Sequence, residues 1–209
     1  MAPPHTVYHP EIGEEYFQDI QYHQQSIPRR IMIEVLELAI EIAREGREGR
    51  KIGTLFVLGD EDEVVKRSRC LILDPLSGHP KAAKKLSDPN LRETVKELAQ
   101  LDGGFLVSAE GSVLSAARYF NATAQGLELL LGLGSRHIAA ASMTKQTDAL
   151  AVVVSESSIV RVFNGGVLIA EILPEIYLLN RFNSHVKHPR LTEHPEENIA
   201  VVASKDAVP

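Results

Sequence analysis

The sequence predicts an α/β fold: a single domain with a mixed central sheet of about seven strands flanked by helices. Short apolar runs rich in β-branched residues alternate along the chain with segments of helical period. Residues 149–155, 159–163 and 167–172 are apolar runs separated by tight turns, which predicts a three-stranded meander. Hydrophobic residues make up 44% of the 209-residue chain, which is enough for one buried core.

The first half of the domain supplies a helix and two strands. Apolar residues recur at helical spacing over residues 31–43. The charged segment 44–51 that follows predicts a solvated turn, because its charges alternate in sign. Residues 54–58 form a short apolar run bounded by glycines, as a buried strand would. Residues 69–73 predict a second strand, in which Cys70 would be a small buried thiol.

The second half opens with a helix whose start is marked by Asp88 as the N-cap and Pro89 as the first helical residue. Two strands and a further helix follow, over residues 104–108, 113–118 and 135–146. In the polar tail only residues 199–202 could add an edge strand. We expect residues 1–27 to form an N-terminal arm, residues 28–182 the domain, and residues 183–209 a C-terminal tail.

The composition excludes several classes of protein and partner. A formal net charge of -6 argues against broad binding of nucleic acid, so an anionic ligand must be held by a local cluster of donors. No apolar stretch approaches the ~20 residues of a membrane span, and the first residues do not resemble a signal peptide. The single cysteine excludes an internal disulfide framework. We therefore expect a cytoplasmic protein with no membrane or nucleic-acid partner.

One candidate site begins at Asp102, which stands at the entrance of a strand. Gly103 and Gly104 follow it and let a ligand or a metal approach the backbone. A carboxylate in this position can coordinate Mg²⁺ or Mn²⁺, or accept a proton from a hydroxyl nucleophile. Asp-Gly-Gly is also a common plain turn, and spacing alone leaves both interpretations open.

A second candidate site is the glycine loop that runs into the helix over residues 135–146. Gly134 precedes a hydroxyl, a guanidinium and an imidazole, contributed by Ser135, Arg136 and His137. Backbone amides at a helix start carry partial positive charge, so phosphate oxygens bind there readily, and an arginine adds a forked pair of donors. The alternative is a serine-capped helix with a surface arginine and a histidine packed on the sheet.

A third and weaker candidate is the turn that contains Ser155 and Glu156. The Glu156 carboxylate could reach the same side of the sheet as Asp102, although a solvated hairpin turn explains these residues equally well.

These blocks resemble successive motifs of the diadenylate cyclase domain. The family shows Asp-Gly-Ala, then Gly-Thr-Arg-His-Arg-Ala-Ala, then a strand ending in Ser-Glu-Glu. This chain shows Asp-Gly-Gly at residues 102–104, Gly-Ser-Arg-His-Ile-Ala-Ala at residues 134–140, and Ser-Glu at residues 155–156. The order and the approximate gaps agree over residues 50–172, and the second block is the most specific.

The resemblance implies an enzyme that condenses two ATP molecules into cyclic di-AMP with release of two pyrophosphates. In this family each subunit holds one ATP with a divalent metal, Mg²⁺ or Mn²⁺. Two subunits then meet as a face-to-face homodimer, so that each 3′-hydroxyl attacks the α-phosphate of the other nucleotide.

Carried over residue by residue, the resemblance assigns a role to each candidate. Asp102 would bind the metal and activate the 3′-hydroxyl. The substrate would be held by Gly103, Gly104, Gly134, Ser135, Arg136 and His137, with Ser155 and Glu156 nearby. The adenine would lie against the segment after the strand over residues 113–118, where Tyr119 and Phe120 would form its walls.

The chain departs from the family pattern at four positions. Gly104 replaces an alanine and Ser135 a threonine, and both changes are mild, because serine keeps the hydroxyl and glycine only loosens the backbone. Ile138 replaces the second arginine and Ser157 the second glutamate, which removes a cation and an anion near the site. A non-catalytic sensor that binds ATP or cyclic di-AMP is therefore the main alternative, and an unrelated phosphate-binding α/β domain is the other.

Overall fold

The computed structural model describes residues 26–123 and 134–174, the single residues Phe17, Ile20 and Tyr22, and the backbones of residues 189–194 and 199–204. The leucine-rich stretch that ends at Leu131 lies outside the described residues. The chain divides into two compact units, Met1–Ile172 and Leu173–Pro209.

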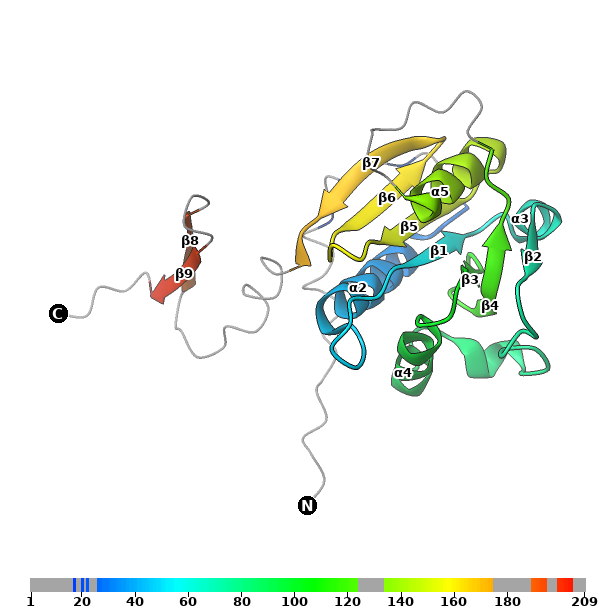
Figure 1. The fold of residues 1–209 in the computed structure, drawn as a ribbon, viewed down its shortest axis with the longest axis horizontal. Coiled ribbons are helices and arrows are strands. Elements are labelled where there is room, and N and C mark those ends of the chain that lie inside the picture. Colours follow the sequence, from blue (N-terminus) through cyan, green and yellow to red (C-terminus); the bar gives the residue numbers. More distant parts are fainter. Residues whose placement is uncertain are drawn as a thin grey trace, which may run out of the picture. The chain divides into compact units, whose positions relative to one another are not determined.

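The first unit is built on a mixed sheet of seven strands (Figure 1). These are β1 (Thr54–Leu58), β2 (Ser68–Cys70), β3 (Gly104–Val107), β4 (Val113–Phe120), β5 (Leu150–Val154), β6 (Val160–Asn164) and β7 (Val167–Ile172). Their order is β2-β4-β3-β1-β5-β6-β7. β1 and β3 run parallel, and all other neighbours are antiparallel. The predicted mixed sheet and the predicted meander β5-β6-β7 are both confirmed.

Helices cover both faces of this sheet. They are α2 (Arg29–Glu45), α3 (Glu61–Lys66), α4 (Pro89–Leu98) and α5 (Ser135–Gln146), with a short 3₁₀ helix η1 (Lys81–Lys84). Leu55 and Val57 of β1 belong to the buried cluster that α5 forms with the sheet, whereas Phe56 and Leu58 alternate to the other face. α2 packs on β5 and β6 and contributes nothing to the α5 cluster, so it covers that other face.

Local sequence signals placed several element boundaries correctly. The side chain of Asp88 accepts a hydrogen bond of 2.9 Å from the amide of Asn90, and Pro89 is the first residue of α4. β1 and α5 span the predicted residues. The short helix α3 was not predicted, because it has six residues and a single buried side chain, Val64, which leaves no helical period to detect.

The region around β2 differs from the prediction. β2 ends at Cys70, residues 71–73 form a bend, and the Leu73 side chain is 95% exposed. The thiol of Cys70 is exposed rather than buried, because β2 is a three-residue edge strand with β4 as its only neighbour in the sheet. β4 is two residues longer than predicted, so Tyr119 and Phe120 belong to the strand instead of following it.

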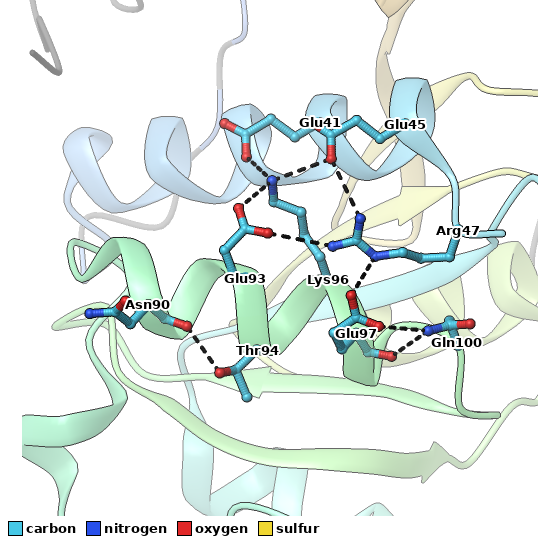
Figure 2. A network of polar contacts seen from close by, with 9 residues as sticks. All are labelled: Glu41, Glu45, Arg47, Asn90, Glu93, Thr94, Lys96, Glu97 and Gln100. Carbon is cyan, nitrogen blue, oxygen red and sulfur yellow. Dashed lines mark hydrogen bonds and ion pairs between the residues drawn. The ribbon is translucent and has the colours of Figure 1, made fainter. Parts of the chain in front are cut away.

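A network of ion pairs joins α2 and α4 (Figure 2). The buried ammonium of Lys96 contacts three carboxylates, at 2.7 Å from Glu93, 3.3 Å from Glu41 and 3.4 Å from Glu45. Arg47 adds contacts to Glu93 and Glu97 of α4. The predicted solvated turn is confirmed at residues 48–51, which are exposed, whereas the Arg47 side chain is 21% exposed and pairs with α4.

The second unit contains two described strands, β8 (Pro189–His194) and β9 (Ile199–Ser204), which pair with each other in antiparallel register. The prediction of a strand at residues 199–202 is confirmed. The prediction that no other part of the tail could form a strand is wrong, because β9 pairs with β8 in a two-stranded sheet of their own. Across the described residues, no helix combines the length and the apolar character that crossing a bilayer requires.

Candidate functional site

Two adjoining hollows lie at the N-terminus of α5, and both are lined by Ser135 and Arg136. The apolar hollow, a cavity of about 150 Å³, has Leu55, Leu71 and Phe120 in its wall. The polar hollow, of about 350 Å³, is lined by residues 134–137 at the start of α5, residues 153–157 at the end of β5 and in the turn after it, and Arg161 of β6. Together they form one cleft in which the two hollows differ in chemistry.

Arg136 links the two hollows and touches a carboxylate on each side. Its Nη2 lies 3.8 Å from Oδ1 of Asp102, and its Nη1 lies 3.5 Å from Oε1 of Glu156. Its Nε is buried and has no hydrogen-bond partner among the described residues. The expectation that Asp102 and Glu156 share one side of the sheet is confirmed by these contacts. A guanidinium with an unused buried donor is suited to binding an anion.

Asp102 stands just before β3, with its carboxylate 88% exposed at the apolar hollow. Its Oδ1 accepts a hydrogen bond of 2.9 Å from the amide of Gly103, which fixes the side chain at the turn. Gly103 has φ +97°, a conformation that L side chains rarely adopt.

Gly104 is required by a close approach between strands. A Cβ added there would lie 2.4 Å from the carbonyl oxygen of Leu55 in β1, a distance that no real Cβ contact allows. The prediction that glycine at this position only loosens the backbone is therefore wrong. An alanine would force β1 and β3 apart beside Asp102.

The start of α5 differs from a serine-capped helix. Gly134 is the N-cap, and as a glycine it has no side chain with which to cap the first turn. The hydroxyl of Ser135 is therefore not used as a cap, and the first turn presents backbone amides that the helix itself does not use. Since α5 has twelve residues, these amides and the helix dipole favour an anion in the polar hollow.

The β5–β6 turn forms the opposite wall of the polar hollow. Ser155 Oγ accepts a hydrogen bond of 3.1 Å from the Ser157 amide and lies 2.7 Å from Ser157 Oγ. The Ser155 amide donates to the Ile159 carbonyl at 2.9 Å and closes the turn. The two hydroxyls and the 72% exposed Glu156 carboxylate thus sit on a turn that its own hydrogen bonds hold in place.

His137 packs into the sheet while still lining the polar hollow. The ring is 7% exposed and meets Phe163 of β6 edge-on, with 6.2 Å between the ring centroids. Its Nε2 lies 3.1 Å from Nη1 of Arg161, whose Nε contacts Glu171 Oε1 of β7 at 2.5 Å. Burial, followed by the positive charge of Arg161, lowers the pKa of His137 below its ordinary value.

Tyr119 and Phe120 both line the apolar hollow but in different ways. Tyr119 is 43% exposed and carries the guanidinium of Arg69 over its ring at 5.0 Å. Phe120 is 3% exposed and belongs to the buried cluster under α5, so only part of it faces the hollow.

Sequence reasoning missed three residues of the cleft. Arg118 lines the apolar hollow and donates to Ser68 Oγ at 3.0 Å and Ser115 Oγ at 3.2 Å. Arg161 lines the polar hollow. Gly53 lies beneath Arg136, since a Cβ there would be 2.9 Å from Nη1 of that arginine. No motif marks these positions, because β4, β6 and the start of β1 meet α5 only in the folded sheet.

The side chains of this cleft could bind a divalent metal only together with a ligand that supplies further oxygen donors. The described residues contain no group of three His, Cys, Asp or Glu side chains able to hold a metal ion. Asp102 offers an exposed carboxylate next to the arginine that would bind phosphate. Mg²⁺ is commonly bound by one or two carboxylates together with substrate phosphates, and the donors here fit that arrangement.

An α/β domain in which a helix N-terminus, arginines and carboxylates converge on one cleft is suited to a phosphorylated ligand. A family model described as "DAC: DisA bacterial checkpoint controller nucleotide-binding" matches residues 41–168. The chain belongs to this family, which excludes an unrelated phosphate-binding domain.

Two curated relatives are named diadenylate cyclase. The protein from Methanocaldococcus jannaschii is 44% identical over 152 residues, covering 72% of this chain and 48% of its own length. The protein from Haloferax volcanii is 40% identical over 148 residues, covering 70% of this chain and 54% of its own. The chain thus spans about half the length of the curated relatives it matches.

Two solved structures resemble the chain at 20% identity. A double mutant of DacA from Staphylococcus aureus has a TM-score of 0.45 and covers 73% of this chain and 94% of its own. A protein from Bacillus cereus described as a hypothetical membrane spanning protein has a TM-score of 0.47 and covers 76% of this chain and 69% of its own.

Proposed function

We propose that this chain is a diadenylate cyclase, which condenses two ATP molecules into cyclic di-AMP and releases two pyrophosphates. The convergence of Asp102, Arg136 and Glu156 from three separate segments on one cleft carries the proposal. Membership in a nucleotide-binding family and the names of the two curated relatives support it.

The two hollows match the two halves of a nucleotide. The polar hollow takes the triphosphate, where Arg136, the Ser135 hydroxyl and the amides of the α5 start supply donors. The apolar hollow takes the adenine against Tyr119 and Phe120. The α-phosphate then lies where the hollows join, beside Arg136 and Asp102. The remaining substrate-binding residues are Gly103, Gly104, Gly134, His137, Ser155 and Glu156.

The chemistry that this arrangement supports is an in-line displacement at phosphorus. The 3′-oxygen of one nucleotide forms a bond to the α-phosphorus of the other, and the bond to the departing pyrophosphate breaks. The Asp102 carboxylate takes the proton of the hydroxyl, while Arg136 stabilises charge on the phosphate. A Mg²⁺ or Mn²⁺ ion held by Asp102 and the phosphates would neutralise further charge when bound. A second displacement closes the ring.

Each subunit is proposed to supply one nucleotide, so that catalysis requires a face-to-face homodimer with two-fold symmetry. Two triphosphates and a chain of net charge -6 repel each other across such an interface, which makes the dimer weak. At low concentration the rate per subunit should therefore rise with enzyme and level off once the dimer is filled. A specific activity that stays flat from nanomolar to micromolar enzyme, without any dimer, would contradict the two-subunit mechanism.

A sensor that binds ATP or cyclic di-AMP without turnover is the second candidate, favoured by Ile138 and Ser157 in place of a charged pair. Incubation of the pure chain with ATP and Mn²⁺, followed by mass spectrometry, separates the two. Cyclic di-AMP in the product supports the cyclase. Its absence, with ATP binding intact by calorimetry, supports the sensor.

The proposal includes a cytoplasmic location and no nucleic-acid partner. The free thiol of Cys70 is compatible with a reducing compartment, and the net negative charge disfavours a phosphate backbone as ligand.

A further inference from the structure

A chain of three charged or polar side chains runs from β7 through β6 to the start of α5. Glu171 and Arg161 are directly opposite each other on β7 and β6, and their side chains are in contact at 2.5 Å. Arg161 extends from there to His137 of α5, with 3.1 Å between Nη1 and Nε2. Arg161 has a 13% exposed side chain, so this contact lies mostly out of solvent.

The contact between Arg161 and His137 fixes the form of the imidazole. A guanidinium carries only donors, so Nε2 of His137 must accept and cannot hold a proton. The ring is then neutral, and its proton is on Nδ1. Nδ1 is buried, and no carboxylate of the described residues hydrogen-bonds to it to stabilise an imidazolium.

Burial and the two nearby arginines act on the ring in the same direction. Arg161 approaches from β6 and Arg136 lies beside it on α5, and both lower the pKa of His137 after burial, the largest cause. Glu171 of β7 and the Gly134 carbonyl oppose the shift, but the Glu171 carboxylate is occupied by Arg161. Burial, which is the largest cause, and the two arginines therefore favour the neutral ring.

We propose that Arg161 is a positioning residue, which holds His137 neutral with its proton on Nδ1 at the wall of the polar hollow. The consequence for ligand binding, which rests on the proposed function, is that the arginines supply the positive charge that faces the triphosphate. His137 contributes a neutral ring. Nucleotide affinity then gains nothing from protonation of His137 when the pH falls.

The direct test is the state of the His137 ring in the ligand-free protein. Long-range ¹H–¹⁵N spectra report which ring nitrogen carries a proton, and comparison with a His137→Gln variant assigns the signal. We expect a single neutral form, protonated at Nδ1, from about pH 5.5 to about pH 8, the range in which an ordinary histidine titrates. An imidazolium at pH 7 or a proton on Nε2 overturns the proposal without any reference to nucleotide.

Two substitutions of Arg161 test its role as the cause. Arg161→Met removes the donor and frees the Glu171 carboxylate to face the ring, so His137 should titrate within the same pH range. Arg161→Lys keeps a donor and a positive charge and should leave the ring neutral. If His137 keeps the same protonation state in the Arg161→Met variant, burial alone determines that state, and the role assigned to Arg161 is overturned.

The functional test is calorimetry of a non-hydrolysable ATP analogue at several pH values. The affinity of Arg161→Met divided by that of the wild-type chain cancels the titration of the ligand itself. We expect this ratio to rise at least about threefold between pH 8 and pH 5.5, because a protonated His137 attracts the triphosphate. If the spectra show that His137 titrates in the variant but the affinity ratio does not change with pH, His137 does not lie at the phosphates. Failure of the wild-type chain to bind the analogue at all would instead contradict the proposed function.

Discussion

The two hollows of the cleft share Ser135 and Arg136 but differ in what else they contain. The apolar hollow is closed by strand side chains of β1 and β4, and it includes Arg118, whose side chain contacts two hydroxyls and a thiol. The polar hollow is closed by a turn and a helix start, and its arginine, Arg161, is paired with a carboxylate.

On the proposed function, the apolar hollow would select the ligand and the polar hollow would bind its charged part. A cation for which the described residues supply no carboxylate partner is costly to keep at 9% exposure, which gives Arg118 a reason to contact a ligand. Arg161 pairs with Glu171 through one nitrogen and contacts His137 through another. Variants that disable the two hollows separately would test this difference.

The largest effect is expected at Asp102, where a substitution should abolish turnover but largely preserve ATP affinity. Asp102→Asn removes the proton acceptor and the metal-binding charge but keeps the side-chain volume. Product formation should be abolished, while ATP affinity stays within about tenfold, or ~1.4 kcal/mol. Turnover is followed by mass spectrometry and affinity by calorimetry. Unchanged turnover would remove Asp102 from the mechanism.

A smaller effect is expected for Arg136→Ala, because this residue serves both hollows. Loss of a charge-assisted contact to phosphate should cost roughly 1.5–3 kcal/mol of binding free energy for ATP and for tripolyphosphate alike. Lys81→Ala is the matched control, since it removes an exposed cation near Glu110 at the β3–β4 turn. Equal affinity in wild type and the Arg136 variant would place the phosphates elsewhere.

Arg118→Met should sharpen the comparison with a still smaller loss. If Arg118 contacts the base or ribose, ATP affinity should fall by about 0.5–1.5 kcal/mol, the net worth of one hydrogen bond. Tripolyphosphate affinity should not change, because that ligand does not enter the apolar hollow. Competition calorimetry with both ligands measures the two losses. A parallel loss for tripolyphosphate would mean that the hollows are not separate sites.

The smallest effect is expected in the α2–α4 network of Figure 2, which touches neither hollow. The hydrogen bond from Lys96 lowers the pKa of Glu93 below its ordinary value. The stabilising effect of this hydrogen bond is therefore present at pH values above the pKa that Glu93 has in the unfolded chain. It is lost as the pH falls through the lower pKa that Glu93 has in the folded protein. Glu93→Gln should flatten the decline of stability below about pH 4.5 and leave ATP affinity unchanged. Urea unfolding of both proteins at several pH values measures the free energy of unfolding. The same decline of stability at acid pH in wild type and variant would contradict the prediction.

Lys96 should show the opposite dependence on pH. Burial works to lower its pKa, but the attraction of Glu93, Glu41 and Glu45 outweighs burial and raises it. The contribution of Lys96 to stability is thus present at pH values below the pKa that Lys96 has in the unfolded chain. It is lost as the pH rises through the higher pKa that Lys96 has in the folded protein. The same unfolding series, extended to alkaline pH, tests this sign.

The sequence by itself determined most of the helices and strands of the main sheet and the candidate motifs of the cleft. β1 and α5 span the predicted residues, and Asp88 with Pro89 fixed the start of α4. These features depend on neighbours within a few residues, through side-chain period and capping, so they can be identified before the fold is known. The family blocks belong to the same category, because each is contiguous in the chain.

The tertiary structure alone decided which distant residues meet in the cleft. Arg118 and Arg161 reach it because β4 and β6 pair in a particular register with their neighbours, and no local pattern specifies that register. The same holds for Gly104, whose need for glycine comes from the Leu55 carbonyl of β1. The exposure of Cys70 follows from the edge position of β2. Sheet order is a property of the whole chain, so the residues it brings together cannot be found by reading segments one at a time.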